Sequence, residues 1–280
     1  MESLNNANQL IGEYEATLAK PRPVAKGMEL YTGVDLGTAY IVLAVVDAEG
    51  KPVAGAMRFA QVVRDGLVVD YVGAVGIVKE LKAHLEERIG QELVCAGAAY
   101  PPGTMEGDQR AIRYVAESAG FEVETMVDEP TAANQVLGIR NGAVVDIGGG
   151  TTGIAVLQDG KVIYVADEPT GGTHFSLVVA GAYKIPFEEA ERLKTDPARQ
   201  QELFPVVKPV MQKVAAIIGS HIRKFPVEAV YLAGGTSCFP GIEQVVQAEV
   251  GIPTYKPENP FLVTPLGIAL WVQKGQVANR

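Results

Sequence analysis

The sequence predicts an α/β protein whose chain forms two similar halves. The first observation is a hairpin pattern at residues 143–161, in which an apolar run, Asp146, a glycine-threonine loop and a second apolar run follow one another. A weaker copy of this pattern surrounds Asp35. The second observation is that short β-like runs alternate with amphipathic helical segments along both halves. A chain of 280 residues has room for two domains of ordinary size.

The composition is that of a globular protein and excludes several classes of function. Hydrophobic residues make up 48% of the chain and charged residues 20%, which provides ample apolar material for a core. The longest uncharged apolar runs, such as residues 41–46, fall far short of the ~18–20 residues that span a bilayer, and the N-terminus lacks the pattern of a signal peptide. A net charge of −9 argues against nucleic acid or an anionic membrane as the main partner.

The cysteines and histidines predict neither a disulfide framework nor a metal site. Cys95 and Cys238 are widely separated and lack Cys-x-x-Cys spacing, so we interpret them as reduced, structural thiols of a cytoplasmic protein. The three histidines are scattered and show no metal-ligand spacing.

Residues 1–27 form an N-terminal extension. Its apolar residues recur every three to four positions, as on one face of a helix: Leu4, Ala7, Leu10, Ile11, Tyr14 and Leu18. Pro21 and Pro23 end the pattern because proline cannot continue a helix. This helix either packs on the body of the protein or serves as a docking peptide for a partner surface.

Residues 28–140 predict a first domain of strands followed by alternating helices and strands. The expected strands are residues 30–35, 41–46, 52–59, 67–69, 93–99 and 121–127. The expected helices are residues 75–89, with Gly90 as the C-cap, and 109–118, closed by Gly120.

Residues 141–263 predict a second domain of the same kind. The hairpin around Asp146 returns through a strand at 161–166, and an apolar segment covers 175–183. Helices are expected at 187–194, 206–224 and from Ile242 to Val250, with a strand at 227–233. A last helix within 264–280 completes the first domain, and residues 140–142 form a hinge.

The glycines after Asp146 predict a phosphate-binding loop. Residues 148–153 satisfy the dinucleotide pattern G-x-G-x-x-G, but a strand, an Asp-Gly turn and another strand follow, where a Rossmann fold requires a helix. Glycines at a hairpin tip instead let backbone N–H groups approach phosphate oxygens, and Asp146 supplies the hard oxygen ligand that Mg²⁺ prefers. The alternative is a tight hairpin with ordinary turn glycines.

Five motifs resemble those of the actin, Hsp70 and sugar-kinase superfamily, in the same order from about residue 30 onward. They are the first phosphate motif (35–38), the Glu-Pro-Thr-Ala-Ala connecting segment (129–133), the second phosphate motif (145–152), the adenosine motif (232–237) and the second connecting helix (265–269). Within this superfamily, the short length and the N-terminal extension are most similar to the chaperone-like ethanolamine-utilisation proteins that are associated with bacterial microcompartments.

The resemblance implies two ribonuclease-H-like (actin-like ATPase) domains, with mixed five-stranded sheets flanked by helices, that close on Mg-ATP. It implies that Asp35 and Asp146 hold Mg²⁺ through water and that Glu129 positions or polarises the attacking water. The implied phosphate cradle is Gly37, Thr38, Gly148, Gly149, Gly150, Thr151 and Thr152. The implied loop that passes the nucleotide is Gly171 and Gly172, and the implied adenosine contacts are Gly234, Gly235 and Thr236. Glu191 and Lys194 either contact ribose and adenine or form a simple i,i+3 surface pair.

Two departures from Hsp70 predict slow hydrolysis and a smaller second domain. The Gly-x-x-Ala-Lys segment with the catalytic lysine is absent, and residues 64–70 instead resemble bacterial actins. A missing cation leaves less stabilisation for charge on the transferring phosphate. The short interval between Thr152 and Gly234 predicts a reduced upper subdomain, and we expect no peptide-binding domain.

The function expected from the resemblance is that of a cytoplasmic, weak ATPase that acts as an assembly factor for the ethanolamine-utilisation microcompartment. The expected partners are ATP or ADP, Mg²⁺, and shell proteins or enzymes of the pathway, with no nucleic acid and no membrane. The alternatives are a nucleotide-binding scaffold without turnover, a filament-forming actin-like protein, and a small-molecule kinase, for which we identify no catalytic aspartate base.

Overall fold

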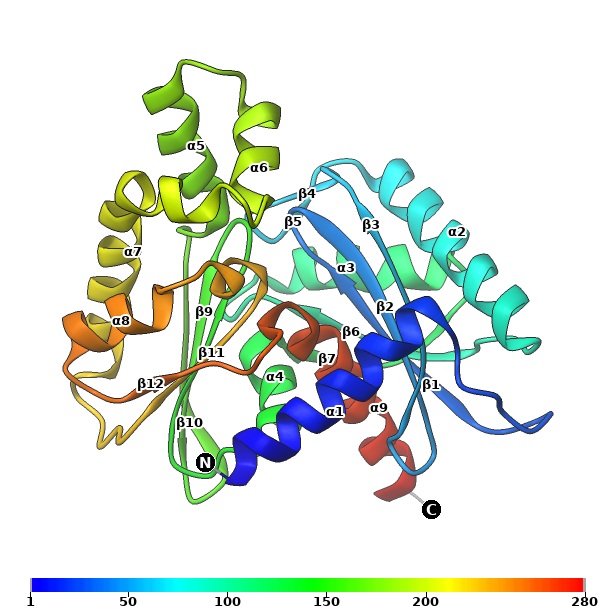
Figure 1. Ribbon diagram of the computed structural model, residues 1–280. Coiled ribbons are helices and arrows are strands. Elements are labelled where there is room, and N and C mark those ends of the chain that lie inside the picture. The colour runs from blue at the N-terminus through cyan, green and yellow to red at the C-terminus, as the bar shows by residue number, and fades with distance from the viewer. Residues whose placement is uncertain (1, 279–280) are drawn as a thin grey trace.

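The computed structural model describes residues 2–278, which form two five-stranded sheets of the same topology (Figure 1). Sheet I has the order β3 (Pro52–Phe59), β2 (Tyr40–Asp47), β1 (Leu30–Leu36), β6 (Cys95–Tyr100), β7 (Glu122–Asp128). Sheet II has the order β10 (Lys161–Glu168), β9 (Thr152–Gln158), β8 (Gly142–Ile147), β11 (Val230–Ala233), β12 (Thr254–Tyr255). In each sheet the first three strands are antiparallel and the last two run parallel to the central strand. The predicted mixed five-stranded sheets are confirmed.

Helices pack on each sheet, and each half of the protein has its own hydrophobic core. In the first half, α2 (Tyr71–Ile89) contacts β2 and β3, and α3 (Glu106–Ser118) contacts β6 and β7. In the second half, α7 (Gln200–Ile222) contacts β9 and α8 (Ile242–Val250) contacts β12. The pair α5 (Gly172–Tyr183) and α6 (Phe187–Thr195) projects above sheet II (Figure 1).

Within the described residues, α7 alone is long and apolar enough to cross a membrane by length and composition. Its residues Leu203, Val207, Val214 and Ile218 are fully buried in the core of the second half. The core helix of a globular domain has the same composition, so α7 is weak evidence for a membrane span.

Two helices, α4 (Glu129–Leu137) and α9 (Val263–Ala278), join the halves. The chain enters α4 from sheet I and α4 contacts β8 and β9, whereas α9 follows sheet II and packs on β1, β2 and β6. The two helices cross so closely that a Cβ at Gly267 would lie 2.0 Å from the carbonyl oxygen of Ala132. A Cβ at Gly33 of β1 would likewise lie 2.4 Å from the carbonyl oxygen of Pro265. Glycine is therefore required at both crossings.

The N-terminal helix α1 (Glu2–Ala19) packs on the body of the protein. Ala7, Ile11 and Tyr14 are at most 1% exposed and belong to the cluster that fills the space between the sheets. Gly55 of β3 allows this contact, because a Cβ there would lie 2.6 Å from the ring of Tyr14. Of the two alternatives for this segment, the packed helix is the one observed. Residue 1 of the extension and residues 279–280 of the predicted C-terminal helix lie outside the described residues.

Several elements have other bounds than the sequence predicts. Helix α2 begins at Tyr71, not residue 75, because the side chain of Asp70 accepts the backbone N–H of Gly73 at 2.9 Å and caps the helix. Helix α7 runs through Pro205 and Pro209, where the pattern suggested a start at residue 206. The segment 175–183 belongs to α5. Four short elements lacked a sequence signal: β4 (Val63–Arg64), η1 (Gly235–Cys238), β12 and η2 (Pro260–Leu262).

Candidate functional site

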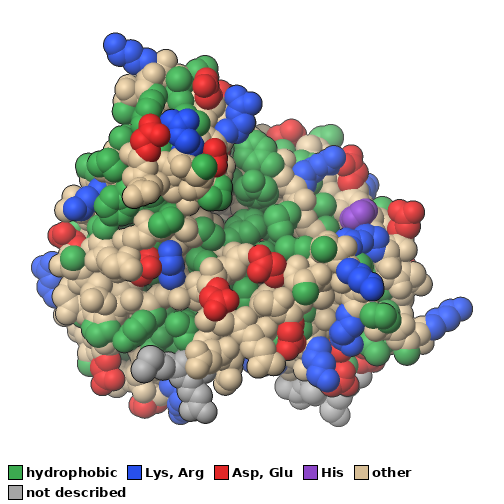
Figure 2. All heavy atoms as spheres, in the orientation of Figure 1, with side chains coloured by type: hydrophobic (Ala, Val, Ile, Leu, Met, Phe, Trp, Pro, Cys, Tyr) green, Lys and Arg blue, Asp and Glu red, His purple; other side chains and the backbone are tan. Residues whose placement is uncertain are grey.

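A cavity of about 360 Å³ lies between the two halves. Figure 2 shows hydrophobic side chains gathered in the hollow between the α5–α6 pair and the upper part of the first half. Most of the predicted site residues line this cavity: Asp35, Gly37, Thr38, Glu129, Asp146, Gly148, Gly149, Gly150, Thr151, Glu191, Lys194, Gly234, Gly235 and Thr236. Motifs from four parts of the chain therefore meet at one place.

Three of the carboxylates that line this cavity lie at the ends of three elements. Asp35 lies at the end of β1, Asp146 lies near the end of β8, and Glu129 is the first residue of α4. Burial and the charge of Asp146 raise the pKa of Asp35 to about 7. Burial raises the pKa of Asp146 to about 6, against the opposing effect of a hydrogen bond donated by the hydroxyl of Thr264. Burial and repulsion from Asp146 and Asp35 raise the pKa of Glu129 well above its ordinary value.

A fourth carboxylate, Asp167 of β10, belongs to the same electrostatic cluster. Burial raises its pKa to about 6, against a hydrogen bond from Thr151, and its charge raises the pKa of Glu129 in turn. Asp167 pairs across the strands with Gly153, which carries no side chain. The sequence motifs did not identify this residue, because it lies on the return strand outside every motif.

The carboxylates fit a hard cation that also has other ligands. Oxygen-rich, negatively charged sites favour Mg²⁺, which retains several waters and binds phosphate oxygens together with one or two carboxylates. In the part of the chain that the structure describes, no group of three or more His, Cys, Asp or Glu side chains could hold a metal ion alone.

The glycine loop after β8 presents backbone to the cavity. The backbone N–H of Gly148 donates to the carbonyl oxygen of Thr151 at 2.9 Å, which closes the loop. A Cβ at Gly149 would lie 3.1 Å from Cβ of Thr38 on the opposite hairpin. A Cβ at Gly150 would lie 2.9 Å from Cα of Asp65, at the turn between β4 and β5 (Leu67–Val68). Side chains at these positions would separate the two halves.

Three predicted site residues lie behind the loop and do not line the cavity. The N–H of Gly172 donates to the carbonyl oxygen of Gly148 at 3.0 Å, and a Cβ at Gly171 would lie 2.6 Å from the same oxygen. The hydroxyl of Thr152 is fully buried and donates to the carbonyl oxygen of Thr170 at 2.6 Å. These residues support the loop from within the second half.

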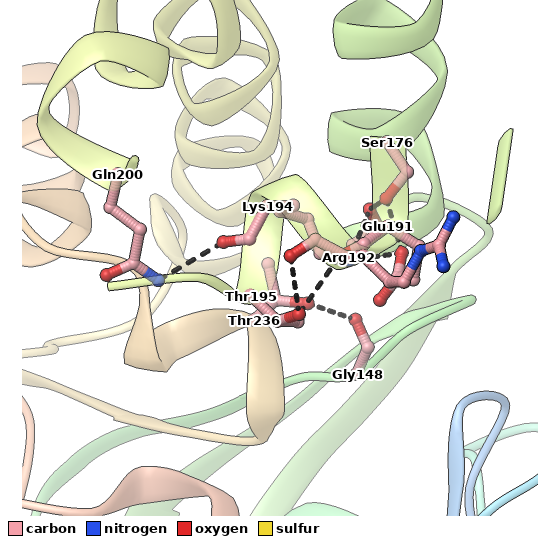
Figure 3. Close-up of polar contacts among 9 residues, drawn as sticks. Gly148, Ser176, Glu191, Arg192, Lys194, Thr195, Gln200 and Thr236 are labelled. Carbon is pink, nitrogen blue, oxygen red and sulfur yellow. Dashed lines mark hydrogen bonds and ion pairs between the residues drawn. The ribbon is translucent and has the colours of Figure 1, made fainter. Parts of the chain in front are cut away.

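Glu191 and Lys194 form a buried ion pair in the wall of the cavity (Figure 3). Their charged atoms lie 2.8 Å apart, and each side chain is 12% exposed. Ser176 donates a hydrogen bond to Glu191, and Lys194 donates to the carbonyl oxygen of Gly172 at 3.1 Å. Burial lowers the pKa of Lys194, although Glu191 opposes the shift. The predicted i,i+3 pair is therefore formed, but it lies in the cavity wall and not on an exposed surface.

The segment after β11 approaches the loop and the carboxylates closely. Gly234 has a φ of 86°, and a Cβ there would lie 2.3 Å from Oδ1 of Asp146. The hydroxyl of Thr236 donates to the carbonyl oxygen of Gly148 at 2.7 Å (Figure 3). The predicted adenosine and phosphate motifs are thus joined by a direct hydrogen bond.

The cavity also has walls that the motifs did not identify. Tyr40 and Phe261 meet edge to face at 5.4 Å between ring centroids, and Asn259 lies beside them. Thr264, which donates to Asp146, also lines the cavity. The sequence marked Thr264 only as the start of a helix, and no predicted motif covers residues 257–262.

Comparisons with known proteins identify the relatives of this chain. Residues 117–267 match the family model described as type IV pilus assembly protein PilM. The ethanolamine utilization protein EutJ of Salmonella typhimurium is 45% identical over 255 residues, which cover 91% of this chain and 90% of that protein. The crystal structure of EutJ from Carboxydothermus hydrogenoformans is 48% identical, with a TM-score of 0.90 and coverage of 96% of this chain and 99% of the other.

A more distant solved structure shows the fold alone. MreB 5 of Spiroplasma citri bound to AMPPNP is 17% identical, with a TM-score of 0.73 over 90% of this chain and 98% of the other. The likenesses confirm the predicted actin-like ATPase fold.

Proposed function

The chain belongs to the family of the ethanolamine utilization protein EutJ, and from this premise we propose that it binds Mg-ATP between its halves and acts as a nucleotide-controlled assembly factor. The single observation that carries the proposal is the convergence of Asp35, Glu129 and Asp146 on a cavity walled by glycine loops. The charge of Asp146 raises the pKa of Asp35, and both charges raise the pKa of Glu129; a bound cation would relieve that repulsion. The AMPPNP bound to MreB 5 is a nucleotide analogue, which supports the choice of ligand.

The three carboxylates and two of the loop glycines have roles that their positions support. Asp35 and Asp146 would hold the water ligands of Mg²⁺, which when bound neutralises phosphate charge. Glu129 would accept a hydrogen bond from the attacking water and orient it. The N–H groups of Gly149 and Gly150 would donate to phosphate oxygens, which a side chain at either position would block.

Turnover would be slow because the cavity holds little positive charge. Among the described residues that line it, Lys194 is the only lysine or arginine, and Glu191 already pairs with it. Charge on a transferring phosphate would therefore receive little stabilisation from the protein. The same observation favours the second candidate function, a scaffold that binds nucleotide without hydrolysing it.

Nucleotide would control the protein through the contact between its halves. Thr38 from the first half already faces Gly149 from the second, so a ligand that bridges these loops would hold the cleft closed. Loss of the terminal phosphate would remove part of that bridge. Shell proteins of the microcompartment or enzymes of ethanolamine utilization are the proposed partners, in the cytoplasm.

The test is a pull-down with purified shell proteins and pathway enzymes, with and without Mg-ATP, together with a phosphate-release assay. We expect a partner whose retention changes with ATP, and we expect Asp146→Asn to abolish that change. A control variant, Asp159→Asn, makes the same charge change at an exposed turn. If Mg-ATP does not change the amount of partner that the wild type retains, nucleotide control is refuted. If phosphate is released only at the background rate, the result favours the scaffold that binds nucleotide without hydrolysing it.

A further inference from the structure

The N-terminal helix α1 touches both halves and one wall of the cavity. In Figure 1 it crosses the front of the molecule from the lower end of sheet II to sheet I. Its buried residues Ile11 and Tyr14 belong to the central cluster, and the hydroxyl of Tyr14 donates to the carbonyl oxygen of Leu43 in β2 at 3.1 Å. Arg88 of α2 donates to the carbonyl oxygens of Leu18 and Ala19 at 3.1 and 2.6 Å. Both the middle and the end of the helix are thus fixed to the first half.

Besides β3, α4 and α9, helix α1 contacts residues 257–262, which we call the wall loop. The side-chain oxygen of Asn8 accepts the backbone N–H of Glu258 at 2.9 Å. The carboxylate of Glu15 accepts a hydrogen bond from Nδ2 of Asn259, also at 2.9 Å. Two polar side chains, two turns apart on the helix, therefore hold consecutive residues of one loop.

The wall loop forms the side of the cavity next to the predicted adenosine motif. Asn259 and Phe261 both line the cavity. The carbonyl oxygen of Pro260 accepts the N–H of Gly234 at 3.0 Å, and the ring of Phe261 lies 3.2 Å from where a Cβ of Gly235 would be. A shift of the loop would therefore change the width of the cavity at this end.

We propose that Asn8 and Glu15 are positioning residues for the nucleotide site, so that nucleotide affinity and the docking of α1 are coupled. The inference rests on the proposed function, because it requires that the cavity binds nucleotide. If docking of α1 positions the wall loop and so raises nucleotide affinity, the coupling must be reciprocal. Bound nucleotide must then stabilise the docked position of α1 by the same free energy. The N-terminal helix then connects the first half of the protein to the wall loop of the site.

The test measures Mg-ATP affinity by calorimetry for the full chain and three variants of α1. Glu15→Ala removes the acceptor for Asn259, and we expect affinity to fall about 3- to 10-fold, the range for one lost hydrogen bond. Glu15→Gln keeps an acceptor oxygen and should bind within about 2-fold of the wild type. Glu13→Ala removes the same charge from the same helix, but the carboxylate of Glu13 accepts its hydrogen bond from Gln9, at 3.0 Å, and not from the wall loop. This variant should therefore also bind like the wild type.

A second measurement follows the helix itself by hydrogen exchange. In the wild type, Mg-ATP should slow exchange of the backbone amides within residues 4–19, and Glu15→Ala should reduce that protection. The inference is overturned if Glu15→Ala binds like the wild type, if Glu13→Ala weakens binding equally, or if nucleotide leaves exchange of the helix unchanged. A wild type that binds no nucleotide overturns the proposed function as well, so the two failures are distinguishable.

Discussion

Replacing Lys194 by methionine should lower the free energy of unfolding by about 2–4 kcal/mol, because it leaves the carboxylate of Glu191 buried without its cation. Breaking a fully buried ion pair costs about 3–5 kcal/mol, and the 12% exposure of both side chains reduces this figure. The substitution also removes the hydrogen bond to the carbonyl oxygen of Gly172. Ser176 still donates to Glu191 but does not neutralise its charge.

Urea unfolding followed by circular dichroism measures this cost, and the chain offers a matched control. Arg199 and Glu202 have the same i,i+3 spacing, but their side chains are 37% and 52% exposed. Arg199→Met should therefore cost less than about 1 kcal/mol. The double variant Glu191→Gln, Lys194→Met should recover much of the loss, because no buried charge remains. If Lys194→Met costs no more than Arg199→Met, the pair is solvated and the reasoning is refuted.

Three further predictions concern the carboxylates and the glycine loop. In EDTA without nucleotide, the free energy of unfolding should rise as the pH falls from about 8 to about 5. In the folded state the pKa is about 7 for Asp35 and about 6 for Asp146, whereas an unfolded aspartate has a pKa of ~3.9. The folded state therefore binds protons more tightly than the unfolded state in that pH range. A flat urea-unfolding profile would contradict this. Gly150→Ala should weaken Mg-ATP binding in calorimetry by about 10-fold or more, because the added Cβ pushes the β4–β5 turn off the loop. Gly181→Ala should bind normally, because a Cβ there has no atom within 4 Å. Equal affinities of the two variants would contradict the close contact at Gly150. Thr264→Val should weaken binding about 5- to 30-fold by removing the hydroxyl that donates to Asp146, and unchanged affinity would show that this hydrogen bond does not position the carboxylate.

The parts of the fold that the sequence predicts are those with local signals. The hairpins at Asp35 and Asp146 each carry an aspartate, glycines and flanking apolar runs within a few residues. Both hairpins form as expected. The strand after Gly153 excluded a Rossmann fold, and β9 is observed there. The sequence predicts helix α7 only from residue 206, yet its buried face holds the helix together through Pro205, a residue type that usually breaks a helix.

The parts that the sequence could not predict depend on contacts between distant segments. Glu191 and Lys194 become buried only because α5 packs beside α6 and brings Ser176 against them. Asn259 and Phe261 line the cavity although no motif marks them. Asn259 also donates a hydrogen bond to Glu15, which lies near the other end of the sequence. Nothing local in either segment encodes such a contact. The domain boundaries near residues 27, 140 and 263 and the functional roles of the site residues stay predictions.

The central claim is that the cavity between the halves binds Mg-ATP through its carboxylates. Isothermal titration calorimetry of ATP tests it most directly, with the wild type, Asp146→Asn and Asp159→Asn, each in Mg²⁺ and in EDTA. We expect one saturable site for the wild type and for Asp159→Asn in Mg²⁺, and no binding for Asp146→Asn or for the wild type in EDTA. Absence of binding by the wild type, or equal affinity for Asp146→Asn, would contradict the claim.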